Sequence, residues 1–446
     1  MTTNKNSIGT EMKKVLFLIS FLFIGFSTIN KGVAQVIASG NCGANGNNLT
    51  WTLTSDGVLN IEGSGPMANY DPPYFTGPQI PWGSHIDKIK TLSIGNSVTT
   101  IGSYILWGCW SVTSISIGNS VTIIGKGAFQ KCKNIKSITI PNSVITIDEE
   151  SFDSCTSLTG TLTIPNSVTK IGKSAFCYCV DLTSVLIGNS VRTIGSQTFY
   201  GCEKIKTITI PSSVTTIGSK SFQGCYELTE IIVNGNNPNY CSNNGILYNK
   251  IQDTLIQCPA GKIGEINILN SVSTIEEYAF FGCSKITSLI IGNSVNRIGQ
   301  VAFSYCSGLK SIKSYAIVPP TTSFNTFVGV PKTIPISVPC NSENAYKNAS
   351  GNQGWKDFTN YTNCINVGLP DFIQTNNITL YPNPASTELH MQLSNPEPTD
   401  YIIYNNFGQM IQQGKVQEKA TVNIESWANG VYFIRILGAM KKIIKY

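Results

Sequence analysis

Charged residues and histidine are scarce in this chain of 446 residues. Lys, Arg, Asp and Glu make up 13% of it, about half of the usual share in soluble proteins. The 31 basic and 25 acidic residues leave a net charge of +6, and basic residues spread so thinly argue against a nucleic-acid partner, which needs them in a patch. The two histidines, His85 and His390, argue against a His-dependent metal site and against a Ser-His or Cys-His relay.

Candidate catalytic groups are also few. The acidic pairs Glu149-Glu150 and Glu276-Glu277 fall in turn segments of a repeat described below, where a solvated face is the ordinary role of carboxylates. No GxGxxG, P-loop, HExxH or GxSxG motif stands in a credible setting. We therefore expect a protein that is not an enzyme and that holds no cofactor and no metal ion.

Long apolar runs are missing except near the N-terminus. Lys13 and Lys14 precede an apolar run at residues 15–29, and Gly32-Val33-Ala34 follows as a small-residue cleavage site. This pattern is typical of a secretory signal peptide cut after residue 34, and the run is short for a membrane-spanning helix. Because the signal-peptide pattern begins at Met12, residues 1–11 are consistent with a mis-assigned translation start. The sequence predicts an exported protein with no transmembrane helix in the mature chain.

A repeat fills the middle of the chain. Asn-Ser-Val or Ser-Ser-Val recurs at steps of 23 or 24 residues, with one step of 58 (272 − 214), and cysteines recur at the same intervals. The repeated positions are Val98, Val121, Val144, Val168, Val191, Val214, Val272 and Val295, and Cys109, Cys132, Cys155, Cys179, Cys202, Cys225, Cys283 and Cys306. A unit of this length cannot bury its own apolar edge, so stacked units, and hence a solenoid, are expected.

Each repeat carries apolar residues at i, i+3 and i+5, as in Ile135, Ile138 and Ile140 or in the later triple that begins at Ile263. The last two alternate with polar residues, so they point inward from a short strand. We expect residues 89–312 to form one ladder of strands over a continuous core.

The spacing resembles a leucine-rich repeat. The particular form, with Ser-Val-x-x-Ile-Gly followed by Ala-Phe-x-x-Cys, resembles the BspA-like class of bacterial surface proteins, which implies adhesion to host or partner proteins. The step of 58 is two repeats plus 12 residues (58 − 46). The segments Asn244–Tyr248 and Thr254–Gln257 make this insertion, near 235–262, a hairpin of the kind that recurs in that class.

The C-terminal residues change character. Short alternating strands separated by turns predict a small Ig-like β-sandwich. The motifs Tyr381-Pro382-Asn383-Pro384 and Gly430-Val431-Tyr432, with a basic C-terminus, resemble the C-terminal sorting domain of type IX secretion cargo in Bacteroidetes. That resemblance implies recognition by the type IX secretion machinery and a secreted or outer-surface location in a Bacteroidetes-type Gram-negative bacterium. An accessory Ig-like domain is the alternative.

The cysteines of the repeat follow an Ala-Phe pair and face the core, so we interpret them as inert buried thiols, although stacked neighbours would also lie within disulfide range. Off the repeat, Cys340 and Cys364 bracket one segment. An exported chain meets an oxidising compartment, and a disulfide between these two is left open by the sequence. A bond between Cys241 and Cys258 is the weaker possibility.

Two sets of residues are candidates for binding a partner. Outward strand positions form rows of Ser and Thr that can pair as hydroxyl ladders, and apolar Leu186, Ile232 and Ile290 interrupt these rows. Aromatic residues beside the cysteines either pack between coils or form an exposed ridge for glycan stacking or protein contacts. These aromatic residues are Trp107, Trp110, Tyr178, Tyr200, Tyr226, Phe281 and Tyr305.

The sequence thus predicts a mainly β chain: a leucine-rich repeat solenoid followed by a small Ig-like β-sandwich. The expected segments are a signal peptide (1–34), an N-terminal cap (35–85), the solenoid (86–339), a C-terminal cap (340–364), a linker (365–375) and the sorting domain (376–446). We expect a surface or secreted protein that mediates adhesion or binds a protein or glycan ligand, with a host matrix protein as one candidate partner. The alternative is a structural surface-layer or matrix component without a specific ligand.

Overall fold

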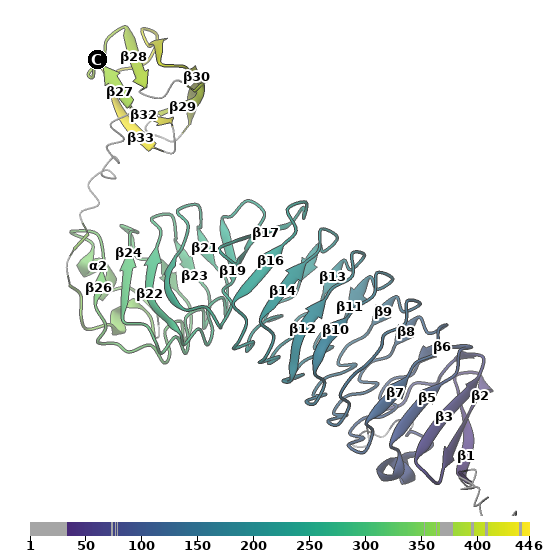
Figure 1. The fold of residues 1–446 in the computed structure, drawn as a ribbon. Coiled ribbons are helices and arrows are strands. Elements are labelled where there is room, and N and C mark those ends of the chain that lie inside the picture. The colour runs from purple at the N-terminus through teal and green to yellow at the C-terminus, as the bar shows by residue number, and fades with distance from the viewer. Residues whose placement is uncertain are drawn as a thin grey trace, which may run out of the picture.

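The computed structural model describes residues 34–72, 75, 77, 79–351, 353–362, 364–365, 378–393, 397–405, 409–436 and 439–446. The expected signal peptide lies outside these residues except for Ala34, and so does nearly all of the expected linker. In the described part, short β-strands form the coils of a solenoid, stacked side by side along its axis, and a separate small β domain lies at the C-terminal end of the chain (Figure 1).

The N-terminal cap is a hairpin-linked sheet that turns into the first coil. Strands β1 (Val36–Gly43), β2 (Gly46–Thr54) and β3 (Val58–Gly63) are antiparallel, and β3 then pairs in parallel with β5 (Thr91–Ile94). Trp82, just before a 3-10 helix (Gly83–Lys88), is fully buried and donates its indole N–H to the carbonyl oxygen of Ile105 at 2.9 Å. This residue closes the open end of the core.

Most coils contribute one strand to each of two faces, because inward apolar residues recur at two places in the repeat. The first face holds β5, β7 (Ser114–Ser116), β10 (Gly160–Thr163), β12 (Leu182–Leu186), β14 (Thr207–Ile210) and β16 (Glu230–Val233). The second face holds β4 (Gly65–Pro66), β6 (Val98–Ile101), β8 (Ile123–Ile124), β9 (Thr146–Ile147), β11 (Lys170–Ile171), β13 (Thr193–Ile194) and β15 (Thr216–Ile217). Neighbouring strands are parallel and one repeat apart, as Ile171 opposite Ile194 illustrates.

The coils stack into a solenoid as expected, but their strands do not form one ladder. On the first face the sheet that ends at β7 and the sheet that begins at β10 are separate, and the coil at 135–140 between them holds no assigned strand. The coil that follows carries the extra residue of the 24-residue step, where Gly160 has φ +75° and the register shifts. A second interruption, at the insertion, divides both faces.

The insertion is a three-stranded antiparallel unit, one strand more than the expected hairpin. It comprises β17 (Tyr240–Asn243), β18 (Ile246–Asn249) and β19 (Thr254–Gln257). Strand β19 also pairs in parallel with β21 (Thr274–Ile275), so the second face resumes there and continues through β23 (Arg297–Ile298) and β25 (Thr321–Thr322). The first face resumes with β20 (Gly264–Asn267), β22 (Ile286–Ile291), β24 (Ser311–Ser314) and β26 (Ile336–Ser337).

The solenoid core is divided in two at the insertion, which corrects the expectation of a continuous core. One cluster runs from Cys42 to Leu247 and the other from Ile246 to Phe358. Buried phenylalanines stack from coil to coil within each part, with centroids 5.1 Å apart between Phe152 and Phe176. The first stack is Phe129, Phe152, Phe176, Phe199 and Phe222, and the second is Phe280, Phe303 and Phe327.

Ile263 does not occupy the buried position that the repeat pattern assigns to it, since its side chain is 75% exposed. Gly264, with φ +80°, opens β20, and the register shifts directly after it. This conformation, which favours glycine, turns the preceding residue toward solvent.

The repeat cysteines are buried free thiols, as expected. Those after the first donate their S–H to a turn carbonyl of the preceding coil, as Cys155 does to Phe129 at 3.2 Å and Cys202 to Phe176 at 3.1 Å, whereas Cys109 donates to Ile86 of the N-terminal cap. Burial raises the pKa of the Cys202 thiol well above its ordinary value of 9.0. The weaker disulfide possibility is wrong, because Cys241 and Cys258 are both free and Cys258 is buried in the second core cluster.

The C-terminal cap closes the second core with aromatic side chains. Helix α2 (Glu343–Lys347) carries buried Tyr346, whose ring centroid lies 5.1 Å from that of buried Trp355. A disulfide joins Cys340 to Cys364, with Cα atoms 4.7 Å apart.

The C-terminal domain consists of two antiparallel sheets around its own core, consistent with an Ig-like sandwich. One sheet contains β27 (Ile378–Tyr381), β28 (Glu388–Leu393) and β31 (Lys419–Asn423). The other contains β29 (Thr399–Asn405), β30 (Met410–Val416), β32 (Gly430–Ile436) and β33 (Ala439–Lys445).

Candidate binding surfaces of the solenoid

The turn that follows each second-face strand has the same backbone in almost every coil. The residue two positions before the core phenylalanine and the residue two positions after it both have positive φ, in the left-handed region. Glycine suits this region because it lacks a Cβ, and five turns have it at the second position: Gly108, Gly201, Gly224, Gly282 and Gly329. Tyr178 and Tyr305 instead hold that position with φ of 54° and 61°.

Each of these two tyrosines lies against the glycine at the same position in the next coil. A Cβ built on Gly201 would come within 2.7 Å of the Tyr178 ring, and one on Gly329 within 3.1 Å of the Tyr305 ring. The first left-handed position shows the same pairing, with Tyr104 against Gly127. Packing between coils therefore explains part of the aromatic pattern.

We call the row of aromatic side chains on these turns the turn edge: Trp107, Trp110, Tyr178, Tyr200, Tyr226, Phe281 and Tyr305. Trp110 is 63% exposed, and Tyr178, Tyr226 and Tyr305 are each about half exposed. The other three are less exposed than these four.

The members of the turn edge come together in local groups. Tyr178 and Tyr200 meet edge to face at 5.3 Å, and Phe281 and Tyr305 do the same at 5.3 Å. The Lys131 ammonium lies 4.6 Å from the Trp107 ring centroid. The coils between Trp110 and Tyr178 add no aromatic side chain to this edge, so it is a series of patches and not one continuous ridge.

The apolar residues of the first face are not brought together. Leu186 and Ile232 are exposed, but Thr209 of the intervening coil pairs with Ile232 and separates the two. Ile290 lies beyond the insertion, is half-buried and stands between Asn267 and Lys313. These three residues form isolated apolar points on a hydroxyl-rich face.

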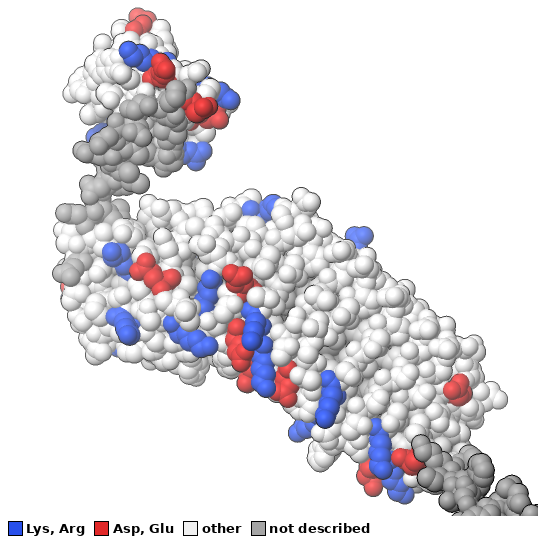
Figure 2. All heavy atoms as spheres, viewed as in Figure 1, with Lys and Arg blue, Asp and Glu red and all other residues white. Residues whose placement is uncertain are grey.

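Most of the surface seen in Figure 2 carries no charged side chains. They gather in a band along one edge of the solenoid, with both signs mixed. Glu149, a member of one acidic pair, forms an ion pair with Lys126 at 3.2 Å. Among the residues that the structure describes, no group of three His, Cys, Asp or Glu side chains could hold a metal ion.

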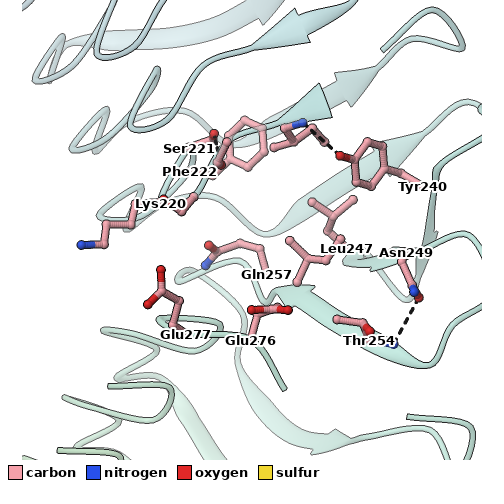
Figure 3. Close-up of a pocket in the computed structure, with 14 residues that line it drawn as sticks. Lys220, Ser221, Phe222, Tyr240, Leu247, Asn249, Thr254, Gln257, Glu276 and Glu277 are labelled. Carbon is pink, nitrogen blue, oxygen red and sulfur yellow. Dashed lines mark hydrogen bonds between the residues drawn. The ribbon is translucent and has the colours of Figure 1, made fainter. Parts of the chain in front are cut away.

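Sequence reasoning missed a pocket of about 370 Å³ at the insertion, where the two parts of the solenoid meet. Figure 3 shows Lys220, Ser221 and Phe222 on one side, Glu276 and Glu277 on another, and Leu247 between them. The signal that could have found it is the sequence Gln257-Cys258-Pro259-Ala260, which replaces the usual Ala-Phe-x-x-Cys.

The motif residues of the C-terminal domain tie its strands together. Asn383 donates its side-chain amide to the carbonyl oxygen of Lys442 at 2.9 Å and accepts from the backbone N–H of Ile444 at 2.8 Å. Pro382 and Pro384 flank it in an exposed bend that follows Tyr381, the exposed last residue of β27.

The second motif anchors the other sheet. Gly430 is the exposed first residue of β32, while Tyr432 is buried against Trp427 and donates its hydroxyl to the carbonyl oxygen of Ala428 at 2.9 Å.

Known families account for the chain from residue 84 onward. Residues 84–182, 159–265 and 249–379 match the BspA type leucine rich repeat region in six copies. The chain belongs to the BspA type leucine-rich repeat family. Residues 379–446 match the secretion system C-terminal sorting domain, which makes this BspA type repeat protein a secreted or cell-surface protein of the type IX pathway in Bacteroidetes.

Solved structures of similar fold are bacterial leucine-rich repeat proteins. A leucine rich cell surface protein from Faecalibacterium prausnitzii is 24% identical with a TM-score of 0.50, over 71% of this chain and 97% of that one. A leucine-rich repeat protein from Eubacterium ventriosum is 24% identical with a TM-score of 0.47, over 70% and 84%. At 24% identity, the likeness to the Faecalibacterium prausnitzii protein shows the fold alone.

One curated relative is an enzyme. Beta-agarase A from Zobellia galactanivorans is 37% identical over 78 residues, which span 17% of this BspA type repeat protein and 14% of the agarase. The families matched by the present chain are a repeat region and a sorting domain, both of non-enzymatic type. No helix among the described residues is long and apolar enough to span a membrane.

Proposed function

We propose that this protein, once outside the cell, binds a protein or glycan partner through the turn edge and has no catalytic activity. The observation that carries the proposal is the exposure of Trp110, Tyr178, Tyr226 and Tyr305 on turns fixed by the solenoid. Aromatic side chains with one face packed and the other in water give large contact area at low entropic cost, which is why they dominate protein hot spots.

A structural surface-layer component without a specific ligand is the second candidate. The observation that favours it is the packing of Tyr178 and Tyr305 against glycines of the next coil, which gives both rings a purpose within the solenoid itself. Trp110 discriminates the two candidates, because it is 63% exposed.

Binding by the purified protein to an array of glycans and matrix proteins tests the proposal, with ligand-dependent thermal stabilisation as a second readout. We expect Trp110→Ala and Tyr226→Ala to weaken binding at least fivefold without lowering the melting temperature. Ile251→Ala is the matched control, because Ile251 is an exposed apolar side chain in the insertion and is not a member of the turn edge. A protein that binds nothing on the array, or variants that bind like the control, would favour the structural role.

A further inference from the structure

The pocket at the insertion exists because one coil has a shortened turn. Leu255 pairs with Ile275 in the second face. Downstream, the N–H of Cys258 bonds the carbonyl oxygen of Ala279, as the N–H of Phe280 bonds that of Ala302. Cys258 therefore occupies the position that Phe280 holds in the next coil. It follows Leu255 by three residues (258 − 255), whereas Phe280 follows Ile275 by five (280 − 275).

The same coil is short again after this point. The N–H of Lys262 bonds the carbonyl oxygen of Pro259 as the N–H of Ile286 bonds that of Cys283, so Pro259 occupies the position of the repeat cysteine. Pro259 follows Cys258 by one residue (259 − 258), whereas Cys283 follows Phe280 by three (283 − 280). A turn that lacks four residues and a phenylalanine leaves space between Phe222 and the next coil. The phenylalanine stack is interrupted at this place.

The turns on either side of the short coil meet above it. The Lys220 ammonium lies 3.9 Å from the Tyr278 ring centroid, and the Lys285 ammonium donates to the carbonyl oxygen of Tyr226 at 3.4 Å. These contacts join residues about two coils apart and hold the two parts of the solenoid around the pocket. The pocket is therefore built by the fold.

The interior of the pocket has an apolar floor and unused polar groups. Phe222, Leu247 and Ile256 supply the floor. Gln257, 6% exposed, donates its amide N–H groups to Cys258 and Ala279, which leaves its side-chain oxygen to accept.

Further donors and acceptors line the walls. The Tyr240 hydroxyl accepts from the N–H of Ile217 at 3.0 Å, which leaves its proton to donate. Among the described residues, neither Glu276 nor Glu277 has an ion pair within 4.0 Å, and Figure 3 shows both beside the cavity, with Lys220 across from Glu277.

The mixture of charges selects the ligand class. A ligand with a single sign of charge would be attracted by one wall and repelled by the other. A neutral ligand whose hydroxyl groups both donate and accept hydrogen bonds can use every wall, and the apolar floor suits the C–H face of a sugar ring. The volume of about 370 Å³ lies within the range of small-molecule sites. We propose that this pocket binds a neutral sugar unit of a glycan.

This sugar site is distinct from the turn edge, and it deepens the proposed function by naming neutral sugars as one ligand class. The probes are maltose, cellobiose, laminaribiose and lactose at about 10 mM, an excess over a millimolar Kd, with the full-length protein. Saturation-transfer NMR detects binding and titration gives Kd. We expect Glu276→Gln/Glu277→Gln to weaken the bound disaccharide about tenfold with an unchanged melting temperature.

The matched control is Glu149→Gln/Glu150→Gln, an acidic pair on a turn of full length and outside the lining of this pocket, and it should leave Kd unchanged. Trp110→Ala should also leave it unchanged, which separates this site from the turn edge. Failure of all four disaccharides to bind, or equal binding by the pocket variant and the control, overturns the proposal. Binding of free lysine or glycine in preference to the sugars overturns the ligand class.

Discussion

The pairing of a left-handed tyrosine with a glycine in the next coil can be tested by two substitutions at equivalent positions. Gly108 and Gly201 have φ of 68° and 69°. They differ in surroundings: a Cβ on Gly108 would meet nothing within 4 Å, whereas one on Gly201 would lie 2.7 Å from the Tyr178 ring. Gly108→Ala therefore reports the backbone cost alone, and Gly201→Ala adds a steric cost.

The left-handed conformation costs an alanine roughly 1–2 kcal/mol, and overpacking adds roughly 1–3 kcal/mol. We expect Gly108→Ala to lower the local free energy of opening by about 1–2 kcal/mol and Gly201→Ala to lower it by about 2–5 kcal/mol. Because solenoids open locally, native-state hydrogen exchange of amides in the substituted coil and its neighbours is the measurement.

The double variant Tyr178→Ala/Gly201→Ala completes the experiment. With the ring removed, Gly201→Ala should cost no more than Gly108→Ala. Equal losses at the two glycines in the otherwise unchanged protein, or an unaltered Gly201→Ala loss in the Tyr178→Ala background, would refute the packing argument.

Further predictions concern the core, the thiols and the C-terminal domain. Phe176→Ala should destabilise its own and neighbouring coils by about 3–5 kcal/mol, as measured by hydrogen exchange, with distant coils spared; wild-type protection would contradict its burial. Ellman titration of the native protein should modify Cys241 first, since the other free thiols are buried, and rapid reaction of several thiols would speak against that burial. Buried thiols keep their protons in the fold, where their pKa is raised, but ionise near their ordinary value of 9.0 when unfolded. The unfolded chain then binds fewer protons, so the free energy of unfolding should fall as pH rises above about 9; urea unfolding from pH 7 to 11 measures it, and a flat profile would be the contrary result. A chain truncated near Ile373 should accumulate folded in the periplasm, and fractionation that finds it outside the cell at wild-type level would remove the sorting role.

The sequence pattern was sufficient for the solenoid because its period reports which residues face inward. The burial of Val98, Phe176 and Cys202 follows from repetition alone, since each copy must present the same side to the core.

The pocket could not be predicted in this way. The step of 58 residues between two repeats shows only a net surplus of 12 residues (58 − 46). The shortening of one turn by four residues is hidden in this number, because a longer insertion offsets it. The exposure of Ile263 has a similar origin, because a left-handed glycine changes the direction of a side chain without changing the spacing of the apolar residues. The contact of Tyr178 with Gly201 depends on the backbone φ of Tyr178 and on the residue at the same position in the next coil. The sequence of a single repeat shows neither.

The tyrosine–glycine contact also limits how such a protein can evolve. Repeat arrays grow and shrink by duplication and loss of whole units, and a unit with an ordinary turn can be copied into any place. A unit that carries tyrosine at the second left-handed position, as those with Tyr178 and Tyr305 do, must be followed by one with glycine there. Tandem copying of the Tyr178 unit would set a side chain against the tyrosine ring, so this contact restricts which units can follow one another along the solenoid.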